Sequence, residues 1–322
     1  MTAPSDGTAV VARDLSKRFE ATTALDRVSF TIGRGELFGF VGPDGAGKTT
    51  LFRILATVMV ADTGTAEVLG RDVVSGLWTL RRRIGYMPGR FSLYPDLSVL
   101  ENLRFFASVF GTSVERERAQ IDAIYTQLEP FNDRRAAALS GGMKQKLALC
   151  CALVHRPEIL LLDEPTTGVD AVSRREFWDL LAGLKASGMT IVVSTPYMDE
   201  ANRCDRVALI QGGKLLAVDA PARIAASFGR PLFAVHTGGG AARYRTLLAL
   251  REYARTKSVY PFGEALHFTD TNANESDDEI RASAVAFLTA KGLSDMRIER
   301  IDPTVEDVFI DRMGEPEGTR AA

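Results

Sequence analysis

A glycine-rich segment directly after an apolar run is the feature that most constrains the fold of this chain. The run ends at Val41, and the segment from Gly42 to Thr50 fits the pattern G-x-x-x-x-G-K-[ST]. Glycines let the backbone curl so that successive N–H groups face one anion, and the helix that follows adds the positive end of its dipole. Strand, glycine-rich loop and helix in this order predict the phosphate-binding loop (P-loop) of an α/β nucleotide triphosphatase.

The residue types in the loop indicate how it would hold ATP with Mg²⁺. The Lys48 ammonium can reach the β- and γ-phosphates, and the Thr49 hydroxyl can ligate Mg²⁺. We therefore expect the loop to bind nucleotide through Gly42, Pro43, Asp44, Gly45, Ala46, Gly47, Lys48, Thr49 and Thr50.

A second apolar run, residues 159–162, ends in Asp163, Glu164 and Pro165. It reads as a fully buried strand, and ligands of open α/β sheets bind at the carboxyl ends of the strands. Asp163 would hold Mg²⁺ through its water shell, and Glu164 would orient or deprotonate the attacking water. Strands also end in solvated acids without function, but in combination with the P-loop these acids predict a nucleotide triphosphatase.

Residues 139–146 read Leu-Ser-Gly-Gly-Met-Lys-Gln-Lys and precede an apolar helical run. Serine is a good N-cap and paired glycines expose backbone N–H groups, so the segment predicts a second anion pocket. Here the chain resembles the ATP-binding subunits of ABC transporters, whose signature normally reads Leu-Ser-Gly-Gly-Gln. Methionine in the fifth place is common in one exporter branch. The resemblance implies that nucleotide is also contacted by Ser140, Gly141, Gly142 and Met143.

The resemblance extends over about residues 9–225 and covers lesser motifs. Phe19 stands where the family places an aromatic ring against adenine, although aromatic residues are more usually packing residues. Asp170 stands in the segment, called the D-loop, in which an aspartate helps the two nucleotide sites communicate. Residues 84–94 match the family's Q-loop, and residues 192–201 match its switch strand.

Two positions depart from the family pattern. The family has Gln after Pro88, near Mg²⁺ and the attacking water, where this chain has Gly89. At the switch, the family has a histidine that hydrogen-bonds the γ-phosphate, where this chain has Pro196, which lacks even a backbone N–H. A hydrogen bond to a charged group contributes roughly 1.5–3 kcal/mol, so losing one in the transition state predicts hydrolysis slowed by about ten- to a hundredfold.

The family's mechanism gives these departures a functional interpretation. Two ATP-binding domains close head to tail, and each site combines the P-loop and acids of one domain with the signature of the other. A chain with a weakened site and an intact signature can complete a competent site on a partner, which favours a heterodimer. A working homodimer that tolerates both substitutions is the alternative, and the retained Glu164 allows slow turnover.

Composition is consistent with a cytosolic protein of this kind. The chain has 322 residues, of which 46% are hydrophobic, and a formal net charge of −2, which does not imply nucleic acid as a partner. Its three cysteines have no metal-ligand spacing and read as buried small hydrophobic residues. No apolar run reaches 18 residues, so membrane association would come from partner subunits at the inner face of the cell membrane.

Helical periodicity predicts helices between Leu97 and Arg135, within a helical subdomain of about residues 90–155. In the family, this subdomain receives a coupling helix from the transmembrane subunit. The aromatic residues of segment 90–96 fit either core packing or this docking surface.

After about residue 228 the ATPase pattern ends. Strands near 231–236, 258–261, 266–269 and 296–301, with helices near 241–256 and 278–291, predict a β-α-β-β-α-β domain of the ferredoxin-like α+β class. Its two histidines, His236 and His267, read as structural. The expected organisation is a disordered tail (1–8), an ABC ATP-binding domain (9–228), the accessory domain (229–312) and a second disordered tail (313–322).

Residues 302–310 resemble a terminal helix of ABC-2 type exporters, and the whole chain resembles the first ATPase half of fused two-ATPase multidrug exporters of that type. The resemblance implies an ATP-binding subunit that works with ABC-2 type permease subunits and a second ATP-binding domain. The alternatives are a soluble ABC-type ATPase outside transport and a purely regulatory ATP-binding subunit.

Overall fold

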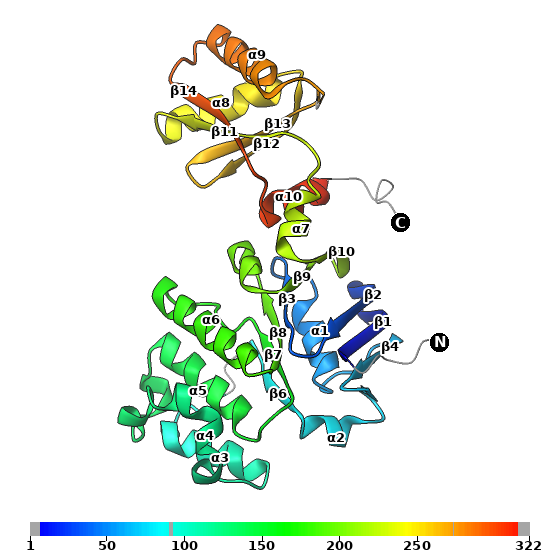
Figure 1. Ribbon diagram of the computed structural model, residues 1–322, viewed down its shortest axis with the longest axis vertical. Coiled ribbons are helices and arrows are strands. Elements are labelled where there is room, and N and C mark those ends of the chain that lie inside the picture. Colours follow the sequence, from blue (N-terminus) through cyan, green and yellow to red (C-terminus); the bar gives the residue numbers. More distant parts are fainter. Residues whose placement is uncertain (1–6, 90–92, 273, 315–322) are drawn as a thin grey trace. The chain divides into compact units, whose positions relative to one another are not determined.

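The computed structural model describes residues 7–89, 93–272 and 274–314. It divides into two compact units, Met1–Pro221 and Ala222–Ala322, most of whose helices and strands are labelled in Figure 1. Within the described ranges, no helix has both the length and the apolar character that crossing a bilayer requires.

A six-stranded sheet carries the P-loop in the first unit. Its strand order is β10-β9-β3-β8-β7-β6; the strands from β9 to β6 pair in parallel, and β10 pairs with β9 antiparallel. Strands β3, β7 and β8 are buried along their whole length, as expected for central parallel strands. Because β3, β6, β7 and β8 run the same way, the loops after them meet at one edge of the sheet. The strands are β3 (Leu37–Val41), β6 (Ile84–Met87), β7 (Ile159–Asp163), β8 (Thr190–Thr195), β9 (Arg206–Gln211) and β10 (Lys214–Asp219).

An antiparallel sheet of order β2-β1-β4-β5 belongs to the same unit. Aromatic rings join it to the large sheet: Phe40 of β3 packs edge-to-face on Phe30 of β2 at 4.9 Å and on Phe52 of α1 at 6.0 Å between ring centroids. Helix α1, which follows the P-loop, is thereby fixed against both sheets. These elements are β1 (Thr8–Phe19), β2 (Thr22–Gly33), β4 (Thr63–Val68), β5 (Arg71–Asp72), α1 (Lys48–Leu55) and α2 (Leu77–Arg81).

The remaining helices of the first unit confirm the helical segment predicted between residues 97 and 135. A capping box formed by Ser98 and Glu101 begins α3, and the Ser113 hydroxyl caps α4. All three cysteines are free and buried, as predicted. The helices are α3 (Val99–Val109), α4 (Val114–Tyr125), η1 (Glu129–Phe131), η2 (Ala136–Ala138), α5 (Gly141–Leu153), α6 (Ala171–Ala186) and η3 (Met198–Arg203).

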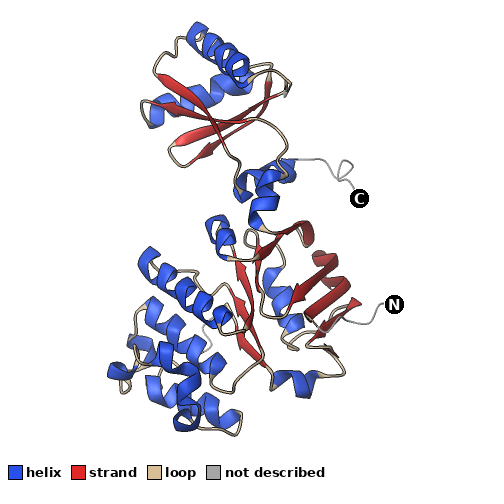
Figure 2. Cartoon of the chain, viewed as in Figure 1, coloured by secondary structure: helices blue, strands red, loops and turns tan. Residues whose placement is uncertain are grey.

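The second unit has the predicted β-α-β-β-α-β order, and its antiparallel sheet has the strand order β12-β13-β11-β14 of a ferredoxin-like fold. Alternate residues of the strands, such as Phe233 and Val235, pack against both Leu250 of α8 and Ile280 of α9, so the two helices cover one face of the sheet (Figure 2). The elements are α7 (Pro221–Ala226), β11 (Leu232–Thr237), α8 (Gly240–Glu252), β12 (Thr256–Phe262), β13 (Ala265–Asp270), α9 (Asp277–Ala290), β14 (Met296–Ile301) and α10 (Val305–Gly314).

The helix predicted over residues 241–256 is shorter than expected, because α8 ends at Glu252. Tyr253 is extended and packs its ring against Phe287 at 4.6 Å, and the Thr256 hydroxyl donates to the carbonyl oxygen of Leu250 at 2.5 Å. Tertiary packing and a side-chain bond to the last turn therefore end the helix, although its apolar periodicity continues.

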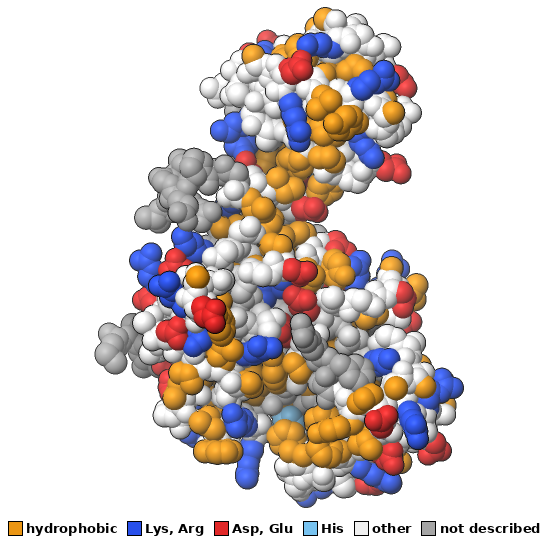
Figure 3. All heavy atoms as spheres, turned by 180° about the vertical axis from the view of Figure 1, so that it is seen from behind, with side chains coloured by type: hydrophobic (Ala, Val, Ile, Leu, Met, Phe, Trp, Pro, Cys, Tyr) orange, Lys and Arg blue, Asp and Glu red, His pale blue; other side chains and the backbone are white. Residues whose placement is uncertain are grey.

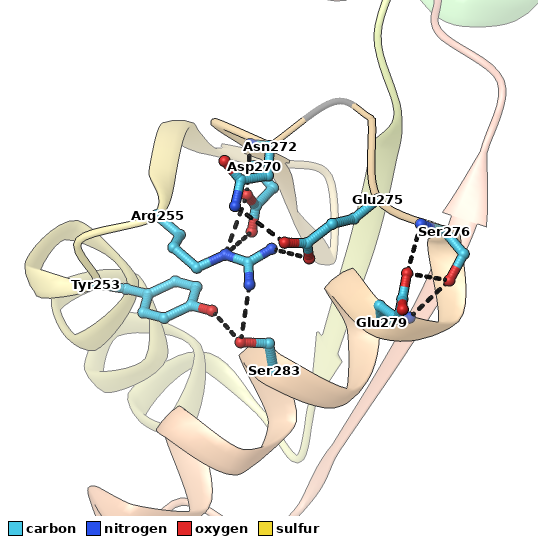
Figure 4. A network of polar contacts seen from close by, with 8 residues as sticks. All are labelled: Tyr253, Arg255, Asp270, Asn272, Glu275, Ser276, Glu279 and Ser283. Atoms are coloured by element: carbon cyan, nitrogen blue, oxygen red, sulfur yellow. Dashed lines mark hydrogen bonds and ion pairs between the residues drawn. The ribbon is translucent and has the colours of Figure 1, made fainter.

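The acidic loop between β13 and α9 is organised by Arg255 (Figure 4). Its guanidinium donates to the buried Asp270 at 3.1 Å, forms an ion pair with Glu275 and contacts Ser283. Tyr253 is also hydrogen-bonded to Ser283, at 2.7 Å. Among the residues that the structure describes there is no group of acids, cysteines and histidines suited to a metal ion, and in this loop the arginine neutralises the acids.

Each of the two histidines in this unit has an acidic partner. His236 contacts Glu299 at 3.1 Å, and the buried His267 contacts Asp307 of α10 at 2.5 Å. Asp307 also accepts hydrogen bonds from Tyr260 and Thr304, so that it ties α10 to the sheet. Burial raises the pKa of Asp307, but the bonds from His267, Thr304 and Tyr260 outweigh it and hold that pKa below its usual value.

Candidate functional site

The P-loop leaves the buried strand β3 and enters α1 at Lys48. Its conformation requires glycine at position 47, where φ is 103° and an added Cβ would lie 2.2 Å from the carbonyl oxygen of Ala24. The Gly47 N-cap supplies no side-chain hydrogen bond to the helix, so the first N–H groups of α1 are left for an anion.

Lys48 is buried, with 3% of its surface exposed, and its ammonium lies inside the loop. Nζ donates to the carbonyl oxygens of Gly42 at 2.7 Å and Pro43 at 2.9 Å, and lies 3.0 Å from Oε1 of Glu164. The ion pair shows that the loop after β3 and Glu164, directly after β7, share one site.

The other predicted loop positions surround this lysine. Asp44 is exposed, whereas Thr49 and Thr50 are half-buried in the first turn of α1. Among the described residues, the Thr49 hydroxyl has no hydrogen-bond partner, which leaves it available to a metal ion.

Asp163 ends β7 and is completely buried. Its Oδ1 accepts a hydrogen bond from the Ser194 hydroxyl at 2.6 Å, while Oδ2 has no partner among the described residues. Mg²⁺ prefers oxygen ligands and keeps several waters, so a buried carboxylate oxygen without a hydrogen-bond partner fits this ion.

Glu164 has a φ of 50°, an uncommon conformation for a residue with a side chain. Its N–H donates to the Ser194 hydroxyl at 2.9 Å, and its side chain is 20% exposed beside Lys48. From this backbone conformation, the carboxylate of Glu164 contacts Lys48 of the P-loop. Such strain is typical of functional sites.

Sequence reasoning gave Ser194 no role, although it contacts both acids. Ser194 lies opposite Asp163 in the parallel pairing of β7 with β8. The signal that could have found it is a hydroxyl residue near the carboxyl end of a second buried strand, but its use requires knowing that the two strands are neighbours.

Gly89 lies against Asp163, two residues after the end of β6. A Cβ built on Gly89 would be 3.0 Å from the carbonyl oxygen of Asp163 and 3.5 Å from its Oδ2. The backbone at Gly89 therefore lies closer to Asp163 than a residue with a side chain would readily allow. Residues 90–92 of the Q-loop lie outside the described part of the chain.

Tyr86 in β6 lies near the same acid. Burial, and secondarily the negative charge of Asp163, raise the pKa of Tyr86 to about 12, so its hydroxyl stays protonated at neutral pH.

Pro196 directly follows β8. Next to it, the Thr195 hydroxyl donates to the buried carboxylate of Glu200, which also accepts from Thr166 at 2.9 Å. The Tyr197 N–H in turn donates to the Thr195 hydroxyl at 3.1 Å. This segment is thus anchored by side chains that do not reach the P-loop, whereas Pro196 offers neither a side-chain nor a backbone donor.

The signature residues lie at the start of α5, and no hydrogen bond or ion pair joins them to the P-loop within the described ranges. The Ser140 hydroxyl caps the helix by accepting from the N–H of Met143 at 3.3 Å. A Cβ on Gly142 would meet Oγ of Ser173 in α6 at 2.6 Å, while Gly141 packs less tightly.

Two further predicted residues make contacts of their own. Asp170 caps α6 through the N–H groups of Val172 and Ser173, and its pKa is lowered mainly by the Ser173 N–H. Phe19, at the end of β1, is 44% exposed, and its ring is flanked by Lys17 at 5.7 Å. It is an accessible aromatic surface rather than a core residue.

An apolar groove of about 810 Å³ lies elsewhere in the first unit, between α2, β6, α3 and α5. Figure 3 shows hydrophobic side chains gathered on a face of this unit. Phe110 stacks on His155 at 3.7 Å, and burial lowers the pKa of His155, which as a neutral ring donates from Nε2 to the carbonyl oxygen of Ile84. The residues that line the groove include Trp78, Arg81, Tyr86, Val109, Phe110 and His155.

Comparison with known proteins places these features in a family. The model of a family described as "ABC transporter" matches residues 25–167. The chain is 40% identical over 216 residues to Nod factor export ATP-binding protein I of Paraburkholderia xenovorans (strain LB400), covering 66% of this chain and 71% of that protein.

It is also 44% identical over 219 residues to the probable multidrug ABC transporter ATP-binding protein YbhF of Escherichia coli (strain K12). That match covers 66% of this chain but only 37% of YbhF.

Solved structures agree in fold. The ATP-binding subunit of an ABC transporter matches with a TM-score of 0.62 at 29% identity, over 69% of this chain and 94% of that one. A dimeric post-hydrolysis state of the ATP-binding cassette MJ0796 bound to ADP and Pi matches with a TM-score of 0.60 at 26% identity, over 66% and 98% of the two chains.

Proposed function

The chain belongs to the ABC transporter family of ATP-binding subunits, and on that premise we propose that it binds MgATP and drives a membrane exporter by closing on a second ATP-binding domain. The observation that carries the proposal is the single edge at which Lys48, Asp163 and Glu164 meet, with 3.0 Å between the lysine and the glutamate.

Each of these residues has a role in this proposal. Lys48 binds the β- and γ-phosphates, Thr49 and Asp163 hold Mg²⁺, and Glu164 accepts a proton from the attacking water. Bound Mg²⁺ would neutralise charge on the phosphate oxygens. The Lys48 ammonium contacts Glu164 and two loop carbonyl oxygens in this structure. When ATP binds, phosphate oxygens would replace these oxygens as partners of the ammonium.

We further propose that the chain's own site hydrolyses ATP slowly. Pro196 provides no donor for the γ-phosphate, and Gly89, whose added Cβ would lie 3.5 Å from Oδ2 of Asp163, has no side chain to approach Mg²⁺ or the attacking water. The intact glycines of the signature suit completion of a partner's site, which supports a heterodimer with a more active second ATPase. Homodimeric assembly is the alternative.

The apolar groove supports docking of a permease subunit of the ABC-2 type. Trp78 is 75% exposed and Val109 is 62% exposed, so burying them under an apolar helix would be favourable. Through such subunits the chain would work at the cytoplasmic face of the cell membrane. The names of its relatives suggest a multidrug or other amphiphilic substrate.

Co-expression with a candidate permease and a second ATPase tests the proposal. We expect the three proteins to co-purify, the complex to hydrolyse ATP, and Trp78→Ala with Val109→Ala to release the permease while ATP still binds. Co-purification with nucleic acid or ribosomes in place of a permease would favour the soluble alternative. ATP binding with no hydrolysis at the chain's own site, even in the complex, would favour a regulatory subunit.

A further inference from the structure

Ser194 is the one side chain in the described part of the chain that hydrogen-bonds both Asp163 and Glu164. Its hydroxyl donates to Oδ1 of Asp163 at 2.6 Å and accepts from the N–H of Glu164 at 2.9 Å. It is completely buried, in register with Asp163 on the adjacent strand. A hydroxyl has one proton, so its donation to Asp163 leaves an oxygen lone pair for the Glu164 N–H, and both bonds form at once.

The two bonds restrain different degrees of freedom. A carboxylate held through Oδ1 cannot rotate freely, and the oxygen left over is Oδ2, which has no partner among the described residues. The Glu164 N–H is shared between this hydroxyl and the main-chain carbonyl oxygen of Ser194 at 3.1 Å, and the two bonds together support a backbone with φ at 50°, which by itself is unfavourable for a glutamate. Outer hydrogen-bond partners of this type orient metal-binding carboxylates and strongly affect metal affinity.

We propose that Ser194 is a positioning residue that presents Oδ2 of Asp163 to the metal ion and holds Glu164 beside Lys48. The inference rests on the proposed MgATP site and adds a residue to it. Ser194 would thus let β8 position both acids whatever residue stands at position 196.

The neighbouring residue provides a matched control. Thr195 is also a completely buried hydroxyl residue of β8, but its side chain points to Glu200, on the other side of the strand. Thr195→Val therefore removes a buried hydroxyl from the same strand without touching Asp163 or Glu164. Ser194→Cys preserves the approximate size of the side chain with a weaker donor, in case Ser194→Ala is poorly folded.

The test measures the dissociation constant of ATP for the whole chain, once with EDTA and once with saturating Mg²⁺. The dissociation constant with EDTA divided by that with Mg²⁺ gives the factor by which the metal tightens ATP binding. We expect Ser194→Ala and Ser194→Cys to lower this ratio by about tenfold or more, with metal-free ATP binding within about twofold of wild type. The electron paramagnetic resonance signal of Mn²⁺ in the ATP complex should change in the same variants.

Thr195→Val should keep the wild-type ratio. An unchanged ratio in both Ser194 variants would overturn the inference and leave the proposed function intact. An equal fall of the ratio in Thr195→Val would overturn it too, because it would reveal general loosening of β8. If Mg²⁺ fails to tighten ATP binding in the wild-type chain, the MgATP site itself is wrong.

Discussion

Introducing the two side chains that the family pattern places at positions 89 and 196, one at a time, tests the proposal that this site hydrolyses ATP slowly. Pro196→His supplies a hydrogen-bond donor directly after β8, next to Thr195, whose hydroxyl is bonded to Glu200. A hydrogen bond to a charged phosphate oxygen contributes roughly 1.5–3 kcal/mol, so we expect this variant to hydrolyse ATP about ten- to a hundredfold faster.

Gly89→Gln should behave differently, because the structure leaves little room for it. The new Cβ would meet the carbonyl oxygen of Asp163 at 3.0 Å, so the Q-loop or the end of β7 must move. Overpacking of this kind costs about 1–3 kcal/mol. For a unit of about 220 residues, each kcal/mol lowers Tm by about 2–4 °C. We therefore expect a less stable variant with a smaller gain in rate than Pro196→His.

The assay compares steady-state hydrolysis and calorimetric Tm for both variants in the assembly that hydrolyses ATP. Gly183→Gln is the matched control, since Gly183 lies on the exposed face of α6 with no atom near its added Cβ. It should keep Tm or raise it, because glycine is a poor helix former. A Tm for Gly89→Gln equal to wild type would refute the close-approach argument, and an unchanged rate for Pro196→His would refute the missing-donor argument.

Three other substitutions test separate parts of the structure. Glu164→Gln should slow hydrolysis by at least about a hundredfold while ATP still binds, measured as turnover against the ATP dissociation constant. Gly142→Ala should cost about 1–3 kcal/mol in urea unfolding because of its contact with Ser173, and less in a Ser173→Gly background. Asp307→Asn should destabilise the second unit by about 1.5–3 kcal/mol at neutral pH. The native pKa of Asp307 lies below the unfolded value of about 3.9, so the carboxylate stabilises the fold above that pH and this stabilisation is lost as pH falls through the native pKa. The free energy of unfolding should therefore differ less between pH 7 and acid pH in Asp307→Asn than in wild type.

The parts of the fold that the sequence predicts are those encoded locally. The P-loop and the acidic end of β7 are contiguous motifs after apolar runs, and the second unit shows alternating strand and helix periods, so all three were predictable. The end of α8 was not, because it depends on Tyr253 reaching Phe287 across the unit.

The site depends on strand neighbours that no local pattern specifies. The bond of Ser194 to Asp163 exists because β8 pairs with β7 in one register, and a shift of one residue would turn Ser194 to the opposite face. The tight contact of Gly89 with Asp163 likewise requires the pairing of β6 with β7. A glycine at a motif position can be recognised from sequence, but the close approach that it permits belongs to the sheet.

The two departures from the family pattern act on different parts of the expected reaction. Gly89 lies against Asp163, so a change there alters the surroundings of the metal, whereas Pro196 follows a strand whose Ser194 still holds both acids. Loss of the switch donor therefore need not disturb the ground-state arrangement of Lys48, Asp163 and Glu164. Catalysis depends on contacts that are stronger in the transition state than in the ground state. A site that keeps its ground-state contacts but lacks a contact to the transition state is expected to bind ATP with nearly undiminished affinity. Its turnover rate is expected to fall.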